Sequence, residues 1–404
     1  MTECPDLYTP RVNDFHQVNA RARAEHPVFY SDTYQAWVIT RYHDVRQVLM
    51  HPRVFSSANA IRPLAPLPPE CLEEFERGYP PTAALVNSDG ATHRRLRRPF
   101  AKYLELRRIR ELEPFIAETA TELVEAMLPA GSGEFMRQFA EPLPLRVTSR
   151  LVGLDPEDQR IAQESSAASS RLFRRSNVNT DEQLGYLKQV IRFQQLLTGL
   201  IEKRRAQPGD DLISFVVAEL APGDAPLGYE ATRELIWSLS GIFGGQTSVT
   251  AALGMALFHL LSNRDQWETL VARPDLVGHA VEELCRYDGP GQTFRRTTTQ
   301  PVTVGDVELP AGTDVMVIIG SANRDEALVD RPDTFDITRP RTRHLAFGLS
   351  SHICVGAALA RAQLRITLST LARTMPGLHL TEGQPVPMDP VINHRKPLEL
   401  HISW

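Results

Sequence analysis

The stretch HLAFGLSSHICVGAALARAQL, residues 344–364, places one cysteine between turn-forming residues and the start of a helix. Glycine and serine precede Cys354, and the small and apolar residues that follow Gly356 are typical of a helix. A thiolate at a helix N-terminus is stabilised by the helix dipole and by backbone amides without a partner inside the helix. The stretch therefore makes Cys354 a candidate ligand for a soft metal ion. The simpler alternative is a buried, inert cysteine.

The composition is that of a soluble globular protein with a sizeable core. The chain has 404 residues, of which 42% are hydrophobic, and 44 basic against 49 acidic residues give a net charge of -5. Basic residues are clustered locally while the total is slightly acidic, which argues against nucleic-acid binding.

The N-terminal residues and the spacing of the cysteines indicate the cellular compartment of the protein. The start of the chain, MTECPDLYTPRVNDFHQ, has no basic segment followed by an apolar one, and no window approaches the ~18 consecutive apolar residues of a membrane span. We expect a cytoplasmic monomer that contacts no membrane. The cysteines lie too far apart to suggest a disulfide framework or a zinc site; they are Cys4, Cys71, Cys285 and Cys354.

Hydrophobic periodicity predicts a mainly α fold with small β-sheets, an α+β class. Apolar and polar residues alternate over about 27–40 and 293–320, which predicts strands, whereas helix-length periodic segments dominate about 90–290. The Pro-rich segment 57–81 is too broken for one long helix and is typical of a lid or binding loop. No repeat or Gly/Ser linker divides the chain, so we expect a single domain over 1–404.

Several residues of the cysteine stretch match a known family. The pattern Phe-Gly-x-x-x-His-x-Cys-x-Gly at 347–356 resembles the haem-ligating loop of the cytochrome P450 family, in particular its soluble bacterial haem-thiolate monooxygenases. The resemblance implies that Cys354 is the axial ligand of the iron of haem b, where the thiolate favours O–O cleavage. It also implies that Phe347 packs near the sulfur, that Gly348 and Gly356 allow tight turns, and that His352 meets a haem propionate. One position departs from the family, because Ser350 stands where a glycine is common.

A second element of the family precedes the cysteine by about seventy residues. Glu283 and Arg286 in EELCR lie at i and i+3, on one face of a helix, where they can pair. The alternative is a surface ion pair of little energetic value. The pair resembles the structural Glu-x-x-Arg element of the family, and the segment SANRDEALVDRPDTFDITRPR resembles the one that leads to the haem loop.

Three basic residues match the family's haem-propionate contacts. THRRLRRPF resembles its His-x-x-x-Arg helix, in which His93 and Arg97 reach the same propionate, while the other arginines of the run form a solvated face. Arg296 in FRRTTT matches the strand arginine that bonds the second propionate, and Arg295 is the competing assignment.

The fourth match is a long helical segment that contains Gly241, Gly244 and Gly245. FGGQTS, residues 243–248, resembles the family motif in which glycines let the helix pass close to the haem while an acid and a threonine manage protons for bound O2. Thr247 and Ser248 fit the motif, with Gly244 as the close-approach residue.

Gln246 replaces the acid of this motif, and an amide cannot deliver a net proton near neutral pH. Two interpretations follow. The protein is a hydroxylase with an altered proton relay, or it couples or dehydrogenates its substrate without inserting oxygen.

The resemblance implies an oxidase of a small organic molecule, in our interpretation a secondary metabolite, that takes O2 and two NAD(P)H electrons through a separate ferredoxin and ferredoxin reductase. Five arginines near the haem elements form a candidate ferredoxin surface: Arg94, Arg98, Arg343, Arg361 and Arg365. The predicted substrate contacts are Val86, Phe173, Ser240, Phe243, Thr293, Phe294 and Ile392. A haem sensor or electron-transfer protein is the alternative of another class, against which the glycine-containing helix with Thr247 counts.

Overall fold

The computed structural model describes residues 15–174, 178–223, 225–389 and 394–404. Their contacts define two compact units, which are treated separately below. Unit 1 comprises the described parts of Met1–Ser56, Ile109–Pro144 and Ser248–Trp404, and unit 2 those of Ser57–Arg108 and Leu145–Thr247. The single domain over 1–404 stays a prediction.

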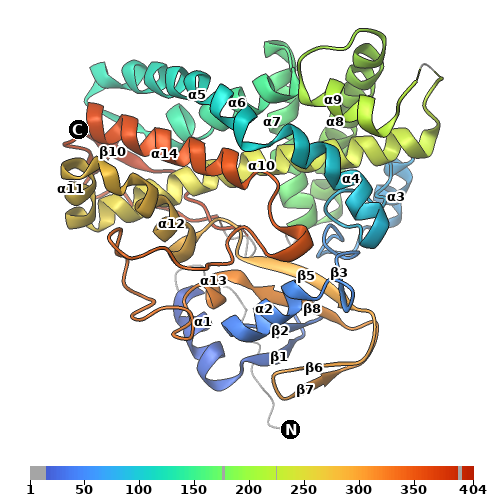
Figure 1. The fold of residues 1–404 in the computed structure, drawn as a ribbon, viewed down its shortest axis with the longest axis horizontal. Coiled ribbons are helices and arrows are strands. Elements are labelled where there is room, and N and C mark those ends of the chain that lie inside the picture. The colour runs from blue at the N-terminus through green and yellow to red at the C-terminus, as the bar shows by residue number, and fades with distance from the viewer. Residues whose placement is uncertain (1–14, 175–177, 224, 390–393) are drawn as a thin grey trace. The chain divides into compact units, whose positions relative to one another are not determined.

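A five-stranded mixed sheet organises one end of unit 1 and unites the two strand-rich pieces of the sequence (Figure 1). In spatial order its strands are β1 (Val28–Ser31), β2 (Ala36–Ile39), β8 (Asp314–Ile318), β5 (Thr293–Thr298) and β3 (Phe55–Ser56). β2 and β8 pair in parallel, with Trp37 opposite Val315, and the other pairs are antiparallel. β-branched and aromatic residues fit such a half-buried pleated surface.

Two smaller sheets complete the β structure described in unit 1. β10 (His401–Ser403) pairs with β4 (Ser132–Glu134) and β9 (His379–Leu380), so the C-terminus is held in an antiparallel ladder. β6 (Val302–Val304) and β7 (Val307–Leu309) form a hairpin that turns at Gly305, whose φ is 56°.

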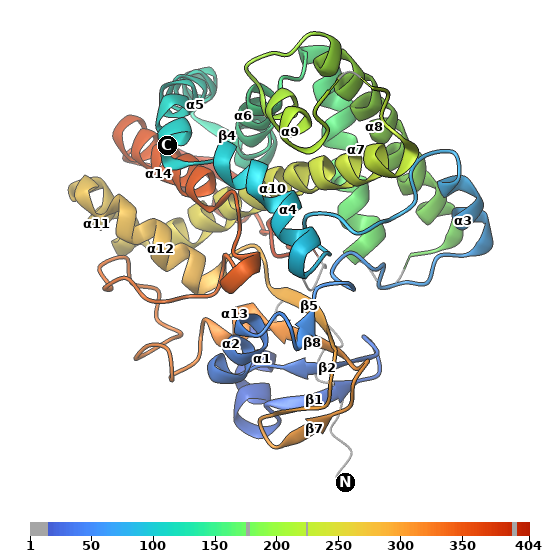
Figure 2. The same ribbon diagram turned by 45° about the vertical axis from the view of Figure 1, so that its right-hand side comes forward.

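Helices lie beside the large sheet and form a second group in unit 1 (Figures 1 and 2). Near the sheet are α1 (Phe15–Glu25), α2 (Tyr42–Met50) and α13 (Ile319–Ala322). The second group includes α11 (Arg264–Ala272), α12 (Val277–Asp288) and α14 (Ala357–Thr374), and α14 contacts both of the others. The core between α2 and the sheet is apolar and includes Val45, Leu49 and Val317.

Glu283 and Arg286 of α12 form a buried ion pair. The side chain of Arg286 has an exposed fraction of 0% and that of Glu283 3%, and the two groups are joined by hydrogen bonds of 2.7 and 2.8 Å. The surface ion pair considered from the sequence is therefore not what the chain forms.

A second buried charge joins four segments of unit 1. The Asp288 carboxylate at the end of α12 accepts hydrogen bonds from Arg395, 3.0 Å away, and from Gln292, and it lies 3.0 Å from His259 and 3.2 Å from His16. Burial alone would raise the pKa of Asp288, but the charges and hydrogen bonds of these neighbours hold it well below the usual value.

Unit 2 is built from helices that contact one another, as Figure 2 shows for α7, α8 and α9. Its helices are α3 (Pro69–Phe75), α4 (Gly90–Tyr103), α7 (Pro156–Arg174), α8 (Thr180–Ala206) and α9 (Leu212–Leu220). α8 begins with a capping box, in which the Asn179 side chain accepts from the Glu182 amide and the Glu182 carboxylate accepts from the Asn179 amide. The Pro-rich segment 57–81 contains α3 in addition to the loop expected there.

Three helices include residues of both units: α5 (Leu106–Met127), α6 (Pro142–Val152) and α10 (Tyr229–Ser262). Among the described residues, only α10 is long and apolar enough to cross a membrane by length and composition, and 56% of its most apolar window is buried, as in a core helix. The long central helix, the helical majority and the small sheets confirm the predicted fold class.

Candidate active site

Cys354 lies in unit 1, in the turn that joins a short 3-10 segment, Ser350–His352, to α14. The Cys354 backbone amide donates a 2.7 Å hydrogen bond to the carbonyl of Phe347, and the Ala357 amide donates to the Cys354 carbonyl at 3.4 Å. Gly356 is the residue that precedes the first helical position. The backbone therefore holds the cysteine at the N-terminal end of an 18-residue helix, as the sequence predicted.

The turn before the cysteine requires two left-handed residues. Gly348 has a φ of 70°, and a Cβ at this position would lie 3.3 Å from the carbonyl oxygen of His352. Ser350 has a φ of 61°, a conformation that glycine adopts without penalty and that costs other residues about 1–2 kcal/mol. The departure noted in the sequence therefore keeps the turn geometry at the expense of backbone strain.

Cys354 differs from the other described cysteines in its exposure. Cys71 and Cys285 are buried, whereas Cys354 is exposed, next to Ile353 with an exposed fraction of 44%. Burial raises the pKa of Cys285 to about 12, so this sulfur stays a thiol. Of the three, Cys354 alone combines an accessible sulfur with a helix N-terminus.

Arg361 of α14 braces the loop from the helix side. Its guanidinium lies 4.2 Å from the centre of the Phe347 ring, and it donates to the Glu282 carboxylate at 2.6 and 3.0 Å. His344 Nε2 lies 3.1 Å from the same carboxylate. Burial by itself would raise the pKa of Glu282, but these hydrogen bonds and charges lower it to about 2, so the ion pair persists at neutral pH.

Arg361 also places a positive charge near the candidate ligand. Burial would lower the pKa of Arg361, but hydrogen bonding to Glu282 and the charges of Glu282, Cys285 and Cys354 raise it. A fixed cation favours the thiolate form of a nearby cysteine. Sequence reasoning assigned Arg361 to the surface and missed Glu282 and His344 altogether.

The strand arginines of β5 point to opposite faces, as neighbouring strand residues do. Arg295 pairs with Asp314 across the ladder, with 4.0 Å between nitrogen and oxygen, and Arg296 is buried and donates a 2.6 Å hydrogen bond to the Arg295 carbonyl. The propionate contact of Arg296, with Arg295 as the competing assignment, stays a prediction. Thr293 is buried and Phe294 half-buried on the same strand.

In unit 2, α4 separates its basic residues by face. His93 is 2% exposed and Arg97 half-buried, one turn apart, while Arg94, Arg95 and Arg98 are exposed. Burial therefore separates His93 and Arg97 from the three exposed arginines of the run. The role of His93 and Arg97 towards a haem propionate remains a prediction.

The glycines of α10 leave open space beside the helix. A Cβ built on Gly244 or Gly245 meets no atom of the described chain within 4 Å, and Gly245 is exposed although it lies in the middle of a long helix. Gln246 is 6% exposed, and its Oε1 has no hydrogen-bond partner among the described residues. Within unit 1, an exposed cysteine at a helix N-terminus is the soft donor that a haem-thiolate centre needs, so the residues present fit this group.

The hydroxyls that follow Gln246 are both in contact with other segments. Thr247 Oγ1 lies 2.5 Å from the Ser166 hydroxyl of α7, within unit 2. Ser248 Oγ lies 3.3 Å from Nε2 of His394, within unit 1. Ser166 is a site residue that sequence reasoning missed, because nothing in the local pattern of α7 marks it.

The predicted substrate residues of unit 2 lie on α7, on α10 and in the segment before α4. A Cβ on Gly241 would lie 3.5 Å from Val86, and the ring of Phe173 meets that of Trp237 edge-on with centroids 5.9 Å apart. Ser240 is half-buried, whereas the Phe243 ring is buried against Phe193 at 4.8 Å between centroids. Ile392 lies outside the described residues.

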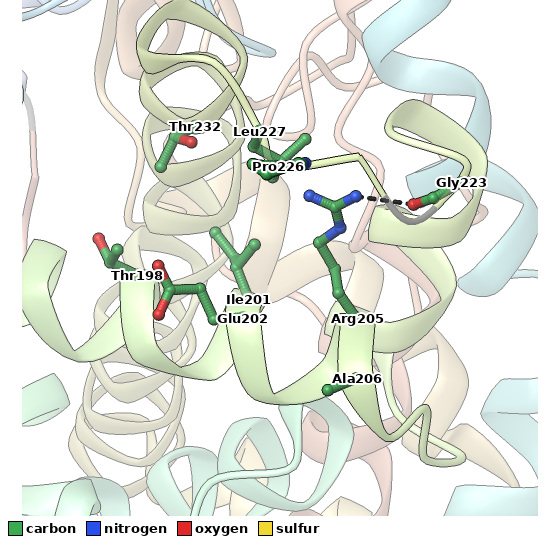
Figure 3. Close-up of a pocket in the computed structure, with 9 residues that line it drawn as sticks. All are labelled: Thr198, Ile201, Glu202, Arg205, Ala206, Gly223, Pro226, Leu227 and Thr232. Atoms are coloured by element: carbon green, nitrogen blue, oxygen red, sulfur yellow. Dashed lines mark hydrogen bonds between the residues drawn. The ribbon is translucent and has the colours of Figure 1, made fainter.

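A pocket of about 360 Å³ in unit 2 lies away from these residues (Figure 3). It is lined by α8, by the segment before α10 and by the first turn of α10, and Arg205 donates a hydrogen bond to the Gly223 carbonyl beside it. None of the predicted site residues lines it.

The arginines expected to meet a ferredoxin divide into two classes. Arg361 is bound to Glu282, and Arg365 donates to Glu113 at 2.6 Å, so carboxylates of the chain already balance both charges. Arg94, Arg98 and Arg343 are exposed.

Replacing Ser350 tests the strained turn. Ser350→Gly should raise the free energy of unfolding by up to about 1 kcal/mol, because removing the left-handed penalty outweighs the added entropy of the unfolded chain. Ser350→Val should lower it, since a branched side chain fits this φ poorly. Denaturant titration of the haem-containing protein measures both, with Ser351→Gly as the matched control. A Ser350→Gly protein no more stable than the Ser351→Gly control would contradict the account.

Comparison with known proteins gives one consistent result. The family model for cytochrome P450 matches residues 261–401. Cytochrome P450 107B1 of Saccharopolyspora erythraea is 33% identical over 94% of this chain and 92% of its own, and nocardicin C N-oxygenase of Nocardia uniformis is 33% identical over 98% and 97%.

Solved structures agree with these relatives. The cytochrome P450 CREJ bound to (4-ethylphenyl) dihydrogen phosphate has a TM-score of 0.90 and 26% identity, with 96% of each chain covered. The CYP116B5 haem domain of Acinetobacter radioresistens has a TM-score of 0.91 and 26% identity, with 98% of this chain and 96% of that one covered. The full-length matches and the geometry around Cys354 lead to one conclusion: this chain is a member of the cytochrome P450 family and an oxidoreductase of its monooxygenase class.

Proposed function

We propose that this P450 inserts oxygen from O2 into a small organic molecule, with Cys354 as the iron ligand of haem b. The observation that carries the proposal is the exposed Cys354 sulfur at the N-terminus of α14, held by the Phe347 carbonyl and flanked by Arg361. When bound, a haem-thiolate centre supplies O–O bond cleavage, which the electron donation of the sulfur favours.

The chain contributes positions and charges to this chemistry. The hydrogen bond from the Cys354 amide and the turn at Gly348 orient the sulfur, and the Glu282–Arg361 pair keeps the Phe347 side of the loop in place. Arg296, His93 and Arg97 supply the basic side chains that would bind the two propionates, and His352 contributes a further imidazole. Charge-assisted hydrogen bonds of this kind are about twice as strong as neutral ones.

Proton handling falls to Thr247 and its surroundings. Gln246 holds a buried amide where the family has an acid, and an amide donates and accepts hydrogen bonds without changing its charge. We assign proton delivery to water that the Thr247 hydroxyl holds, and to Gln246 the role of orienting that water. Ser248 and Gly244 complete the segment. The Ser248 hydroxyl contacts His394, and Gly244 leaves open space beside the helix.

The substrate class that we propose is a polar secondary metabolite. Two relatives that align with nearly the whole chain are named nocardicin C N-oxygenase and mycinamicin IV hydroxylase/epoxidase. Each name gives a secondary metabolite as the substrate of that relative. In this chain the half-buried Ser240 and the ring pair of Phe173 and Trp237 offer a mixed polar and aromatic lining.

Oxidative coupling or dehydrogenation without oxygen insertion is the second candidate function. Gln246 favours this second function, because the need for protons at the active site differs between oxygen insertion and hydrogen abstraction followed by coupling. The exposed glycine at 245 and the intact Thr247 favour insertion, and for this reason insertion is the first candidate.

Labelled dioxygen separates the two functions. Compounds are first screened for a shift of the haem absorption spectrum on binding, and one that binds is then turned over under 18O2. We expect one 18O atom in the product for each turnover. Unlabelled product that has lost two hydrogen atoms, or that is coupled, would overturn oxygen insertion and support the second candidate. Turnover in H218O under unlabelled O2 is the control for exchange.

We also propose that electrons reach this chain from a separate ferredoxin and its NAD(P)H-dependent reductase, in a cytoplasmic, monomeric P450. The exposed Arg98 and Arg343 are the charges that an acidic ferredoxin would meet. Charge reversal of both to Glu should weaken steady-state use of a ferredoxin roughly tenfold at low salt and flatten its salt dependence. Lys188→Glu, an exposed reversal on α8, is the control. An unchanged salt dependence in the arginine variant would place the ferredoxin elsewhere.

A further inference from the structure

A serine of α7 occupies the Phe243 carbonyl, the acceptor that lies four residues before Thr247 in α10. Without this serine the Thr247 hydroxyl could rotate between that carbonyl and the open side of the helix, where it would donate instead of accept. In this chain the Ser166 hydroxyl donates to the Phe243 carbonyl at 3.0 Å and lies 2.5 Å from Thr247 Oγ1. Ser166 is only 8% exposed, so solvent does not compete for these bonds.

Counting hydrogens fixes the direction of the two bonds. A carbonyl oxygen only accepts, so the single hydrogen of the Ser166 hydroxyl is used on Phe243. The short contact between the two hydroxyls then requires Thr247 to donate and Ser166 to accept. The hydroxyl hydrogen of Thr247 is therefore used in the bond to Ser166 of α7. Towards any other partner the Thr247 oxygen offers only lone pairs, so it can only accept a hydrogen bond.

We propose that Ser166 is a positioning residue that fixes Thr247 as a hydrogen-bond acceptor on its remaining side. A group bound there must bring its own hydrogen, as a water molecule or a protonated oxygen does. Thr247 then orients such a donor, and a net proton comes from the donor or from water behind it. The inference rests on the role of Thr247 in the proposed function and adds the residue that sets its polarity.

The contact also links two helices with different tasks. α7 carries Phe173, a predicted substrate contact, near its C-terminal end, and α10 carries the oxygen-handling segment. The ring of Phe243 packs against the ring of Phe193 in α8, and both rings are buried. The carbonyl that accepts the Ser166 hydrogen bond therefore belongs to a residue whose side chain is held in place. Ser166 therefore bonds to a fixed point of α10.

Five variants test the assignment: Ser166→Ala, Ser166→Thr, Thr247→Val, the double variant Ser166→Ala with Thr247→Val, and Ser165→Ala. Ser165 is 2% exposed and its side chain points about 100° away around the same helix, which makes it a matched loss of one buried hydroxyl. Ser166→Thr retains the hydroxyl and serves as the rescue variant. Each is purified as the haem-containing full chain.

The first readout needs no known substrate. With a ferredoxin and its reductase, hydrogen peroxide released per NAD(P)H consumed reports how often reduced oxygen escapes. Thr247→Val and Ser166→Ala should each raise this ratio about two- to tenfold, the range that one hydrogen bond supports. The double variant should rise no further than Thr247→Val, and Ser165→Ala and Ser166→Thr should stay near the wild-type value.

The second readout is the melting temperature, which does not depend on turnover. Ser166→Ala and Thr247→Val should each lower Tm by roughly 2–4 °C, and the double variant should fall short of their sum, because both remove the same bond. Additive shifts would overturn the contact itself.

The outcomes separate this inference from the proposed function. A raised peroxide ratio in Thr247→Val with a wild-type ratio in Ser166→Ala would overturn the role of Ser166 and leave Thr247 in place. A wild-type ratio in Thr247→Val would overturn the Thr247 role on which the inference rests.

Discussion

The buried Glu283–Arg286 pair is the constraint on which the ligand side of this P450 depends. Arg286 uses its remaining donors on the carbonyls of Asn323, Pro332 and Thr334, which lie along the irregular segment that follows the large sheet. That segment leads to the loop that contains Cys354. At the start of this loop, the Leu345 amide donates a 2.7 Å hydrogen bond to the Asn323 side chain. Removing one partner of a buried pair typically costs about 3–5 kcal/mol. The pair therefore supports the route of the chain towards Cys354.

Two adjacent acids of α12 secure that loop from different directions. Glu283 faces the segment that arrives from the sheet, where it also accepts from Arg339, and Glu282 binds Arg361 and His344 on the side of α14. Arg361 in turn covers the ring of Phe347, and the backbone carbonyl of Phe347 accepts the hydrogen bond from the Cys354 amide. One helix turn thus fixes both the approach to the turn and the start of α14, and the left-handed Ser350 is tolerated because its surroundings determine its conformation.

The sequence was sufficient for elements whose chemistry is local, and insufficient for contacts between distant segments. The cysteine pattern lies within ten residues, and the i, i+3 pair and the i, i+4 pair of His93 and Arg97 each lie within about one helical turn, so spacing alone revealed them. The burial of Arg286 depends on carbonyls about forty residues later, and Arg361 was expected on the surface because Glu282 lies 79 positions away. Ser166 is 81 positions from Thr247 and follows no motif, so only the packing of α7 on α10 within unit 2 reveals it.

The central claim is that the exposed sulfur of Cys354 binds the haem iron, and its most direct test is the absorption spectrum of the reduced, carbon monoxide-bound protein. Wild-type protein should show the strongly red-shifted Soret band of a thiolate ligand, the feature that gives this family its name. Cys354→Ser should lose that band while Cys285→Ser, which changes a buried thiol of α12, keeps it. A wild-type spectrum without the band, or a Cys354→Ser spectrum that retains it, would contradict the assignment.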